Sequence, residues 1–347
     1  GGSDGTNDVW GFSEGGREFV LLGLRSGTAF VEITNPTAPL YLGKLPGHGS
    51  SRSIWRDIET YQRHAFIASE AFGHGVQVFD LGALFSVSAP PVEFQETSHY
   101  AHDGGEALGG AHTLAINEAS GFLYASGSNT CSGGLHMVDI RSPREPRFAG
   151  CFAEDGYTHD VQCVSYDGPD PDYRGREICF ASNEDTLTVV DVTDKAKPRM
   201  VSRTSYQGVG YIHQTWVTPD RLFLLMDDEL DEQYFRHNTS TRVWDIADLD
   251  RPAHIGSHVA DTPAIDHNLY IRDGLVYQAN YRAGLRILKL DRIAEGRLEP
   301  AGFFDVYPAD DAPEFNGAWS AYPFFPSGVV AMSDIEQGLF LLKPEIP

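Results

Sequence analysis

The chain lacks any run of 18 apolar residues, so its sequence predicts no transmembrane segment. Basic residues are also scarce, since 26 Lys and Arg stand against 49 Asp and Glu and the formal net charge is -23. Nucleic acids and anionic membranes are bound through basic surfaces, and we therefore expect neither as a partner. A phosphate-binding Walker loop and a His-Glu-x-x-His zinc motif are absent as well, which argues against two easily recognised enzyme classes.

Cysteine is rare, and the four that occur lie close together at Cys131, Cys151, Cys163 and Cys179. The repeat described below places the first two in one unit and the last two in the next. Both spacings suit disulfides between neighbouring strands, with buried free thiols as the alternative. Because disulfides persist in oxidising compartments, we expect a secreted or cell-surface protein.

Turn-forming and aromatic residues are plentiful, with 36 Gly, 20 Pro and 12% aromatic residues in 347. This composition is typical of many short strands joined by turns rather than of long helices. Hydrophobic residues make up 41% of the chain, which is enough for a large core.

A repeat of strand-like segments runs through the whole chain. Its clearest element is an apolar strand that ends in an acidic and an aliphatic residue, as in GVQVFDL at 75–81 and GLHMVDI at 134–140. Two strands precede this element, and a Pro-containing turn with a short strand follows it. We predict an all-β, seven-bladed β-propeller of four-stranded blades, a single domain over 1–347. The blades start near residues 7, 56, 112, 159, 213, 267 and 319.

The seventh repeat ends at Lys343 and Pro344 without an outer strand, so its closure stays open at this point. Longer insertions are expected at 82–110 and around 230–240.

Five segments carry a resemblance to a known family, together with the repeats. They are SIWRDI at 53–58, THDVQCV at 158–164, DDELDE at 227–232, AIDHNLYI at 264–271 and ANYRAGLRIL at 279–288. The repeats and these segments resemble the LVIVD-repeat propellers of the choice-of-anchor B family, and the likeness covers nearly the whole chain. This resemblance implies a bacterial exported or surface protein and implies no reaction.

Histidines dominate one column of the aligned inner strands. The column contains Asn7, Arg56, His112, His159, His213, His267 and Trp319. Inner strands border the channel of a propeller, so these four histidines should face one another. Neutral imidazole is the commonest transition-metal ligand, and we predict that His112, His159, His213 and His267 bind a divalent metal such as Fe, Mn, Zn, Cu or Ni. The alternative is that the rings bond to nearby carbonyl or carboxylate groups and fill the channel.

The next column of the inner strands is polar throughout. These residues either orient the histidines or link one blade to the next by hydrogen bonds. They are Asp8, Asp57, Thr113, Asp160, Gln214, Asn268 and Ser320.

A second polar set follows the second strands, which should end at the same face of the channel. Carboxylates and amides suit a hard cation such as Ca²⁺, with ion pairing across the channel mouth as the alternative. The candidate cation ligands are Glu70, Asn183, Asp228, Glu229, Asn280 and Asp334, with Glu184 and Arg282 beside them. The acidic run 227–232 continues outward from Asp228, and its outer half is expected to be solvated.

Three residues are candidates for catalysis. Arg56 and Arg282 are basic residues beside the channel and suit a substrate carboxylate, while Tyr281 offers a hydroxyl nearby. Each has an ordinary alternative as a structural ion pair or a packed aromatic residue.

Three functions remain open at this point. The first is a surface binding or scaffold module that holds a glycan or a protein at the propeller face and the 82–110 insertion. The second is a metal-dependent enzyme, because the histidine set is similar in outline to the four-histidine iron site of carotenoid-cleaving oxygenases. The third is a polysaccharide lyase or hydrolase that binds a uronate through an arginine and abstracts a proton with His or Tyr.

Overall fold

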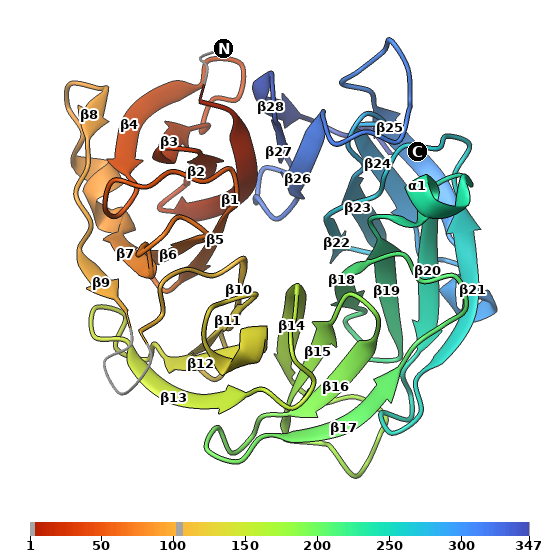
Figure 1. Ribbon diagram of the computed structural model, residues 1–347. Helices are drawn as coiled ribbons and strands as arrows, with labels where there is room; N and C mark the ends of the chain where they lie inside the picture. Colours follow the sequence, from red (N-terminus) through yellow and green to blue (C-terminus); the bar gives the residue numbers. More distant parts are fainter. Residues whose placement is uncertain (1–3, 102–106, 347) are drawn as a thin grey trace.

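The computed structural model describes residues 4–101 and 107–346, which fold into seven sheets arranged in a ring (Figure 1). The sheets follow one another in chain order, so each is one blade of a β-propeller, and the predicted all-β seven-bladed fold is confirmed. Within the described residues the helices are short: α1 (Asp231–Phe235) and the 3₁₀ turns η1 (Leu81–Ser86), η2 (Cys131–Gly133) and η3 (Ile293–Glu295).

Each blade begins with a strand beside the channel. The inner strands are β1 (Thr6–Glu14), β5 (Arg56–Tyr61), β10 (Thr113–Asn117), β14 (Asp160–Ser165), β18 (Ile212–Val217), β22 (Leu269–Arg272) and β26 (Ala318–Tyr322). The antiparallel second strands are β2 (Arg17–Leu24), β6 (His64–Ser69), β11 (Phe122–Ser126), β15 (Glu177–Ser182), β19 (Phe223–Asp228), β23 (Leu275–Ala279) and β27 (Val330–Asp334). An inner strand therefore starts where its second strand ends, at one face of the channel.

The remaining strands lie farther from the channel. The third strands are β3 (Gly27–Glu32), β7 (Val76–Asp80), β12 (Leu135–Asp139), β16 (Leu187–Asp191), β20 (Ser240–Asp245), β24 (Leu285–Lys289) and β28 (Gly338–Leu342). The outer strands are β4 (Leu40–Pro46), β9 (Ser98–Tyr100), β13 (Arg147–Phe152), β17 (Arg199–Thr204), β21 (Ala253–Val259) and β25 (Glu299–Phe304).

The middle strands are apolar because neighbouring blades cover both of their faces. In β15, with the sequence EICFAS, every residue is buried. The hydrophobic clusters accordingly span two blades: Phe180 of β15 packs in one cluster with Leu224 of the next blade and the fully buried Trp244. A strand that is buried on both faces reads as a continuous apolar run, and this is the pattern visible in the sequence.

The seventh blade has three strands, as its sequence indicated, because β26, β27 and β28 have no outer strand among the described residues. The sequence left ring closure open, and the ring closes through contacts between the first and last blades. The backbone N–H of Thr6 donates to the carbonyl of Ile335 at 3.2 Å, and the hydroxyl of Ser327 donates to Glu18 at 2.6 Å. Trp10 packs edge-on against Tyr322 with ring centroids 5.1 Å apart.

The 82–110 insertion covers the outside of the first two blades. It contains the short strand β8 (Val92–Glu93), which pairs in parallel with β4, and the outer strand β9 of the second blade. Residues 102–106 of this predicted binding insertion lie outside the described residues. No helix among the described residues is long and apolar enough to span a membrane.

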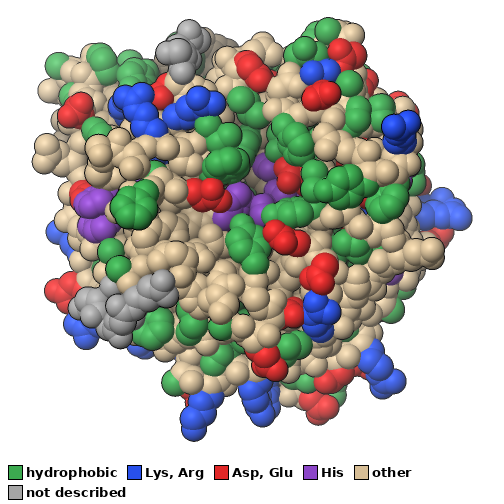
Figure 2. Space-filling model, viewed as in Figure 1, with side chains coloured by type: hydrophobic (Ala, Val, Ile, Leu, Met, Phe, Trp, Pro, Cys, Tyr) green, Lys and Arg blue, Asp and Glu red, His purple; other side chains and the backbone are tan. Residues whose placement is uncertain are grey.

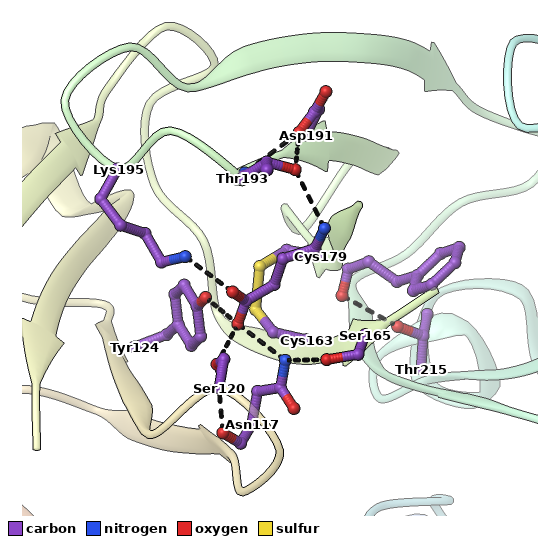
Figure 3. Close-up of a disulfide and its surroundings, with 12 residues drawn as sticks. Asn117, Ser120, Tyr124, Cys163, Ser165, Cys179, Asp191, Thr193, Lys195 and Thr215 are labelled. Atoms are coloured by element: carbon purple, nitrogen blue, oxygen red, sulfur yellow. Dashed lines mark hydrogen bonds and ion pairs between the residues drawn. A yellow bond between two sulfur atoms is a disulfide. The ribbon is translucent and has the colours of Figure 1, made fainter. Parts of the chain in front are cut away.

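Both predicted disulfides are present, and no described cysteine is free. Cys163 of β14 faces Cys179 of β15 in the strand register, and Cys131 of η2 is bonded to Cys151 of β13. Figure 3 shows the Cys163–Cys179 bridge beside a polar cluster. In this cluster Glu177 accepts hydrogen bonds from Asn117, Ser120 and Tyr124 and pairs with Lys195 at 2.7 Å.

Candidate functional site

The four predicted histidines lie side by side at the channel. Neighbouring ring centroids are 4.2 Å apart for His112 and His159, 4.3 Å for His159 and His213, and 4.2 Å for His213 and His267. Each stands at or just before the first residues of an inner strand, where the repeat directs the side chain to the channel. Figure 2 shows histidine side chains at the bottom of a central hollow.

Hydrogen bonds fix the orientation of two of these rings. Nδ1 of His159 donates to the backbone carbonyl of His213 at 3.1 Å, and Nδ1 of His267 donates to that of Trp319 at 2.5 Å. Because a carbonyl oxygen only accepts, the proton of each neutral ring is on Nδ1. Nε2 of His159 and Nε2 of His267 therefore carry lone pairs that are available to a metal.

Carboxylates accompany the other two rings. Nδ1 of His112 lies 2.5 Å from Oε1 of Glu70, the carboxylate–histidine arrangement that orients many metal ligands. Nδ1 of His213 lies 3.4 Å from Oδ1 of the buried Asp227. Glu70, a predicted cation ligand, is thus paired with a histidine ring.

Burial keeps the inner three imidazoles neutral. It lowers the pKa of His159 and His213 well below the usual range, and the neighbouring imidazoles act in the same direction. Burial likewise lowers the pKa of His267 to about 3. A neutral ring with a free lone pair is the form in which histidine binds metals.

Glu229 and Tyr281 join the histidines from the ends of β19 and β23. Oε1 of Glu229 lies 3.6 Å from Nε2 of His267 and accepts a hydrogen bond from the hydroxyl of Tyr281 at 2.8 Å. Burial raises the pKa of Glu229 to about 7. The backbone of Tyr281 has a φ of 33°, a strained conformation for a bulky residue.

The possible ligand atoms do not all converge. One atom each from His213, Glu229 and His267 lie within 4.8 Å of one another, and this group could hold a metal ion. His159 and His112 continue the arc of rings beyond it. Among the described residues, the compact donor set at the channel is therefore two imidazoles and one carboxylate rather than four imidazoles.

His112, His159, His213 and His267 form a layer across the channel, which we call the histidine layer. A cavity of about 520 Å³ opens above it, at the upper face, where the inner strands begin. Its floor is formed by the four histidines with Glu229, and its wall contains aromatic residues. The size falls within the range of small-molecule sites in proteins. The aromatic wall residues are Trp55, Tyr281, Phe315 and Trp319.

Two further cavities continue the channel below the histidines. A space of about 40 Å³ separates the histidine layer from Asp57, Asp160 and Gln214, and is large enough only for water. The same three residues border a cavity of about 340 Å³ toward the opposite face. The histidine layer is thus reached by a ligand from the upper face.

The second polar column of the inner strands lies beneath the histidines. Its side chains were predicted either to orient the histidines or to link the blades by hydrogen bonds, and three of them form such links. Asp8 accepts the backbone N–H of Ile58 at 3.0 Å, and Gln214 accepts that of Leu269 at 2.6 Å. Asp57 accepts the N–H of Leu114 in the same way. In each case a side chain of one blade completes the inner strand of the next.

The two predicted catalytic arginines make structural contacts. Arg56 is buried, and its guanidinium contacts the carbonyl of Leu24 and Nε2 of His74. Arg282 binds Asn316 at 2.7 Å and pairs with Asp310. Neither residue borders the upper cavity, whereas Tyr281 does.

Of the six predicted hard-cation ligands, Glu229 borders the cavity and Glu70 pairs with His112, whereas the other four make contacts elsewhere. Asn183 donates to Asp155 at 2.8 Å. Asp228 accepts hydrogen bonds from Tyr206, Gly210 and Tyr211.

The other two of these ligands, Asn280 and Asp334, are also directed elsewhere. Asn280 borders a separate cavity between the fifth and sixth blades. Asp334 accepts the N–H groups of Glu336 and Gln337 in a turn. The ends of adjacent strands therefore lie at one face, but local hydrogen bonds decide the direction of each side chain.

Trp55, Arg25 and Phe315 also border the cavity and were not predicted from the sequence. Arg25 follows β2, so it holds the position after a second strand that Glu70 and Glu229 hold in their blades. Extending that column to the first blade would have identified Arg25. Phe315 comes from an irregular loop before β26, and no sequence pattern would have identified it.

The expected solvation of the outer half of 227–232 is wrong. Asp231 is 0% and Glu232 is 1% exposed. The cause is α1, which turns both side chains inward beside Arg242 and Asp266.

Comparison with known proteins identifies the fold. No family model matches the chain, and no curated protein matches its sequence. A hydrazine synthase chain of Kuenenia stuttgartiensis is similar, with a TM-score of 0.62, 11% identity and coverage of 95% of this chain and 93% of that chain. A putative 6-phosphogluconolactonase of Bacteroides fragilis gives a TM-score of 0.59 and 12% identity, covering 86% and 84%. A protein of Lactobacillus plantarum gives 0.59 and 13%, covering 93% of each chain. At these identities the likeness establishes a propeller and no activity.

Proposed function

We propose that the protein is an extracellular binding propeller that holds a transition-metal ion at its histidine layer and a small ligand in the cavity above. The observation that carries this proposal is the group His213, Glu229 and His267 at the floor of a cavity of about 520 Å³. Two imidazoles and one carboxylate suit Fe²⁺, Mn²⁺ or Zn²⁺. His159 and His112 are the next donors along the arc.

The location rests on the two disulfides. Covalent cystine bridges are typical of proteins that fold in an oxidising compartment, which supports secretion or surface display. Membership of the choice-of-anchor B family is part of the same proposal and rests on the sequence segments that resemble its repeats. A glycan or protein partner would bind at the upper face, where aromatic residues surround the channel mouth.

A metal-dependent enzyme is the second candidate, and the strained backbone of Tyr281 favours it. Such strain is retained mainly where it positions a functional group, and the Tyr281 hydroxyl is held 2.8 Å from Glu229. A lyase that uses Arg56 or Arg282 to bind a uronate has less support, because both guanidinium groups are engaged away from the cavity.

The proposal is tested by measuring metal content by plasma mass spectrometry on protein purified without a His tag or chelator. We expect close to one equivalent of a transition metal, lost in the double variant His213→Ala/His267→Ala. The control His254→Ala removes an imidazole from the outer strand β21 and should retain the metal. Wild-type protein without a transition metal, or a double variant that retains it, would contradict the proposal. A bound metal accompanied by turnover of a small molecule would favour the enzyme.

A further inference from the structure

A cluster of buried carboxylates lies behind the histidine layer, between the end of β19, α1 and the segment before β22. Their exposed fractions are 0% for four members and 1% for Glu232. Asp266 accepts the backbone N–H of Asp228 at 3.3 Å. Burial raises the pKa of Asp266, and the charges of Glu232, Asp227 and Asp231 raise it further. The members are Asp227, Asp228, Asp231, Glu232 and Asp266.

Some of the carboxylate oxygens have good partners. Asp227 accepts the N–H of Gln214 at 2.7 Å, and Asp228 accepts hydrogen bonds from three donors. One oxygen of Asp231, Oδ2, is bound by Arg242. In this inner part of the cluster, Oδ2 of Asp227 is buried without a hydrogen bond to the described residues.

The outer part of the cluster lacks partners within the described residues. Both carboxylate oxygens of Glu232, Oδ1 of Asp231 and Oδ2 of Asp266 are buried without a hydrogen bond. Burying an ionised carboxylate without a partner is costly, so such groups in proteins are usually paired or coordinate a metal. Arg242 offsets one negative charge and is already engaged with Asp231.

Two carboxylates of this cluster and a histidine are close enough to share an ion. One ligand atom each from Asp231, Glu232 and His237 lie within 4.8 Å of one another. Nδ1 of His237 donates to the carbonyl of Asn238 at 2.8 Å, which leaves a lone pair on its Nε2. The His237 side chain is 39% exposed, so the site is reached from solvent on that side.

We infer that Asp231, Glu232 and Asp266, with His237 at the solvent side, bind a divalent cation. Carboxylate oxygens select hard cations, and the imidazole is compatible with Mn²⁺ as well as with a mainly oxygen-liganded Ca²⁺. The ion would supply the positive charge that Glu232 and Asp266 lack and would fasten α1 to the segment before β22. This site is separate from the histidine layer and stands independently of the proposed function.

The test titrates EDTA-treated protein separately with CaCl₂ and MnCl₂ and follows binding by calorimetry and unfolding by heat. We expect one of these ions to bind at this site and to raise the Tm by about 4 °C when it is in about 100-fold excess over its Kd. In Glu232→Gln this binding and the rise in Tm should be lost.

Asp266→Asn provides a second variant with the same expected loss of binding. The exposed acidic group around Asp248 and Asp250 provides the control, since Asp250→Asn should leave the rise in Tm unchanged. His213→Ala/His267→Ala should also retain it, which separates this site from the histidine layer. The inference is overturned if neither ion binds the wild type, or if Glu232→Gln and Asp266→Asn bind the ion as the wild type does.

Discussion

Replacing Asp8 by Asn should stabilise the protein at alkaline pH and change its stability little at acid pH. Asp8 is fully buried in the channel, and burial raises its pKa from 3.8 to about 6. The ionisable groups that affect it or that it affects are Asp57, Glu59, Asp160 and Tyr270, and none of them is cationic at neutral pH. The carboxylate of Asp8 is therefore ionised at a cost.

The magnitude follows from linkage. Between pH 3.8 and about 6 the native state retains the Asp8 proton that the unfolded chain releases, so stability falls as pH rises. Each pKa unit corresponds to 1.36 kcal/mol, which gives a cost of about 3 kcal/mol at pH 8 and about 0.5 kcal/mol at pH 4. The amide oxygen of Asn can still accept the N–H of Ile58, so the link between the blades is retained.

Urea unfolding followed by Trp fluorescence, at pH 4 and pH 8, measures this difference. Asp8→Asn should raise the free energy of unfolding by up to about 3 kcal/mol at pH 8 only. Asp248→Asn, at an exposed carboxylate, should change it at neither pH. The reasoning is refuted if Asp8→Asn destabilises the protein at pH 8 or stabilises it equally at both pH values.

Three further changes test the fold. Gly150→Ala should cost about 1 to 3 kcal/mol in chemical denaturation, because its Cβ would lie 1.7 Å from the carbonyl oxygen of Lys195; Gly302→Ala, whose Cβ meets nothing closer than 3.5 Å, is the control and should cost less. Glu177→Ala should cost about 3 to 5 kcal/mol, since it leaves a buried lysine unpaired, and an unchanged midpoint would disprove this. Cys131→Ser/Cys151→Ser should cost about 3 kcal/mol by opening a loop closed at a separation of 20 residues, and equal stability of the oxidised and variant proteins would contradict it.

Much of the architecture was predictable because a propeller repeats one local pattern. Apolar strands buried on both faces, separated by Gly and Pro turns, identified seven units and the order of strands within them. The inner-strand register placed His112, His159, His213 and His267 in one column, and they lie side by side in the structure. The cysteine spacings likewise predicted both disulfides.

The sequence could not tell which polar residues at the strand ends reach the channel. Arg25 and Glu229 follow second strands and border the cavity, whereas Asn183, at the equivalent place, donates to Asp155. Asp334, the last residue of its second strand, accepts a hydrogen bond in the turn that follows. Strand position fixes the face on which a residue emerges, but rotamers and local hydrogen bonds fix the direction of its side chain. Only the docking of α1 buries Glu232, which in sequence belongs to an ordinary charged run. The repeat thus determined by itself the number of blades and the histidine column, whereas packing between segments far apart in the chain decided which charges are buried and where ligands can bind.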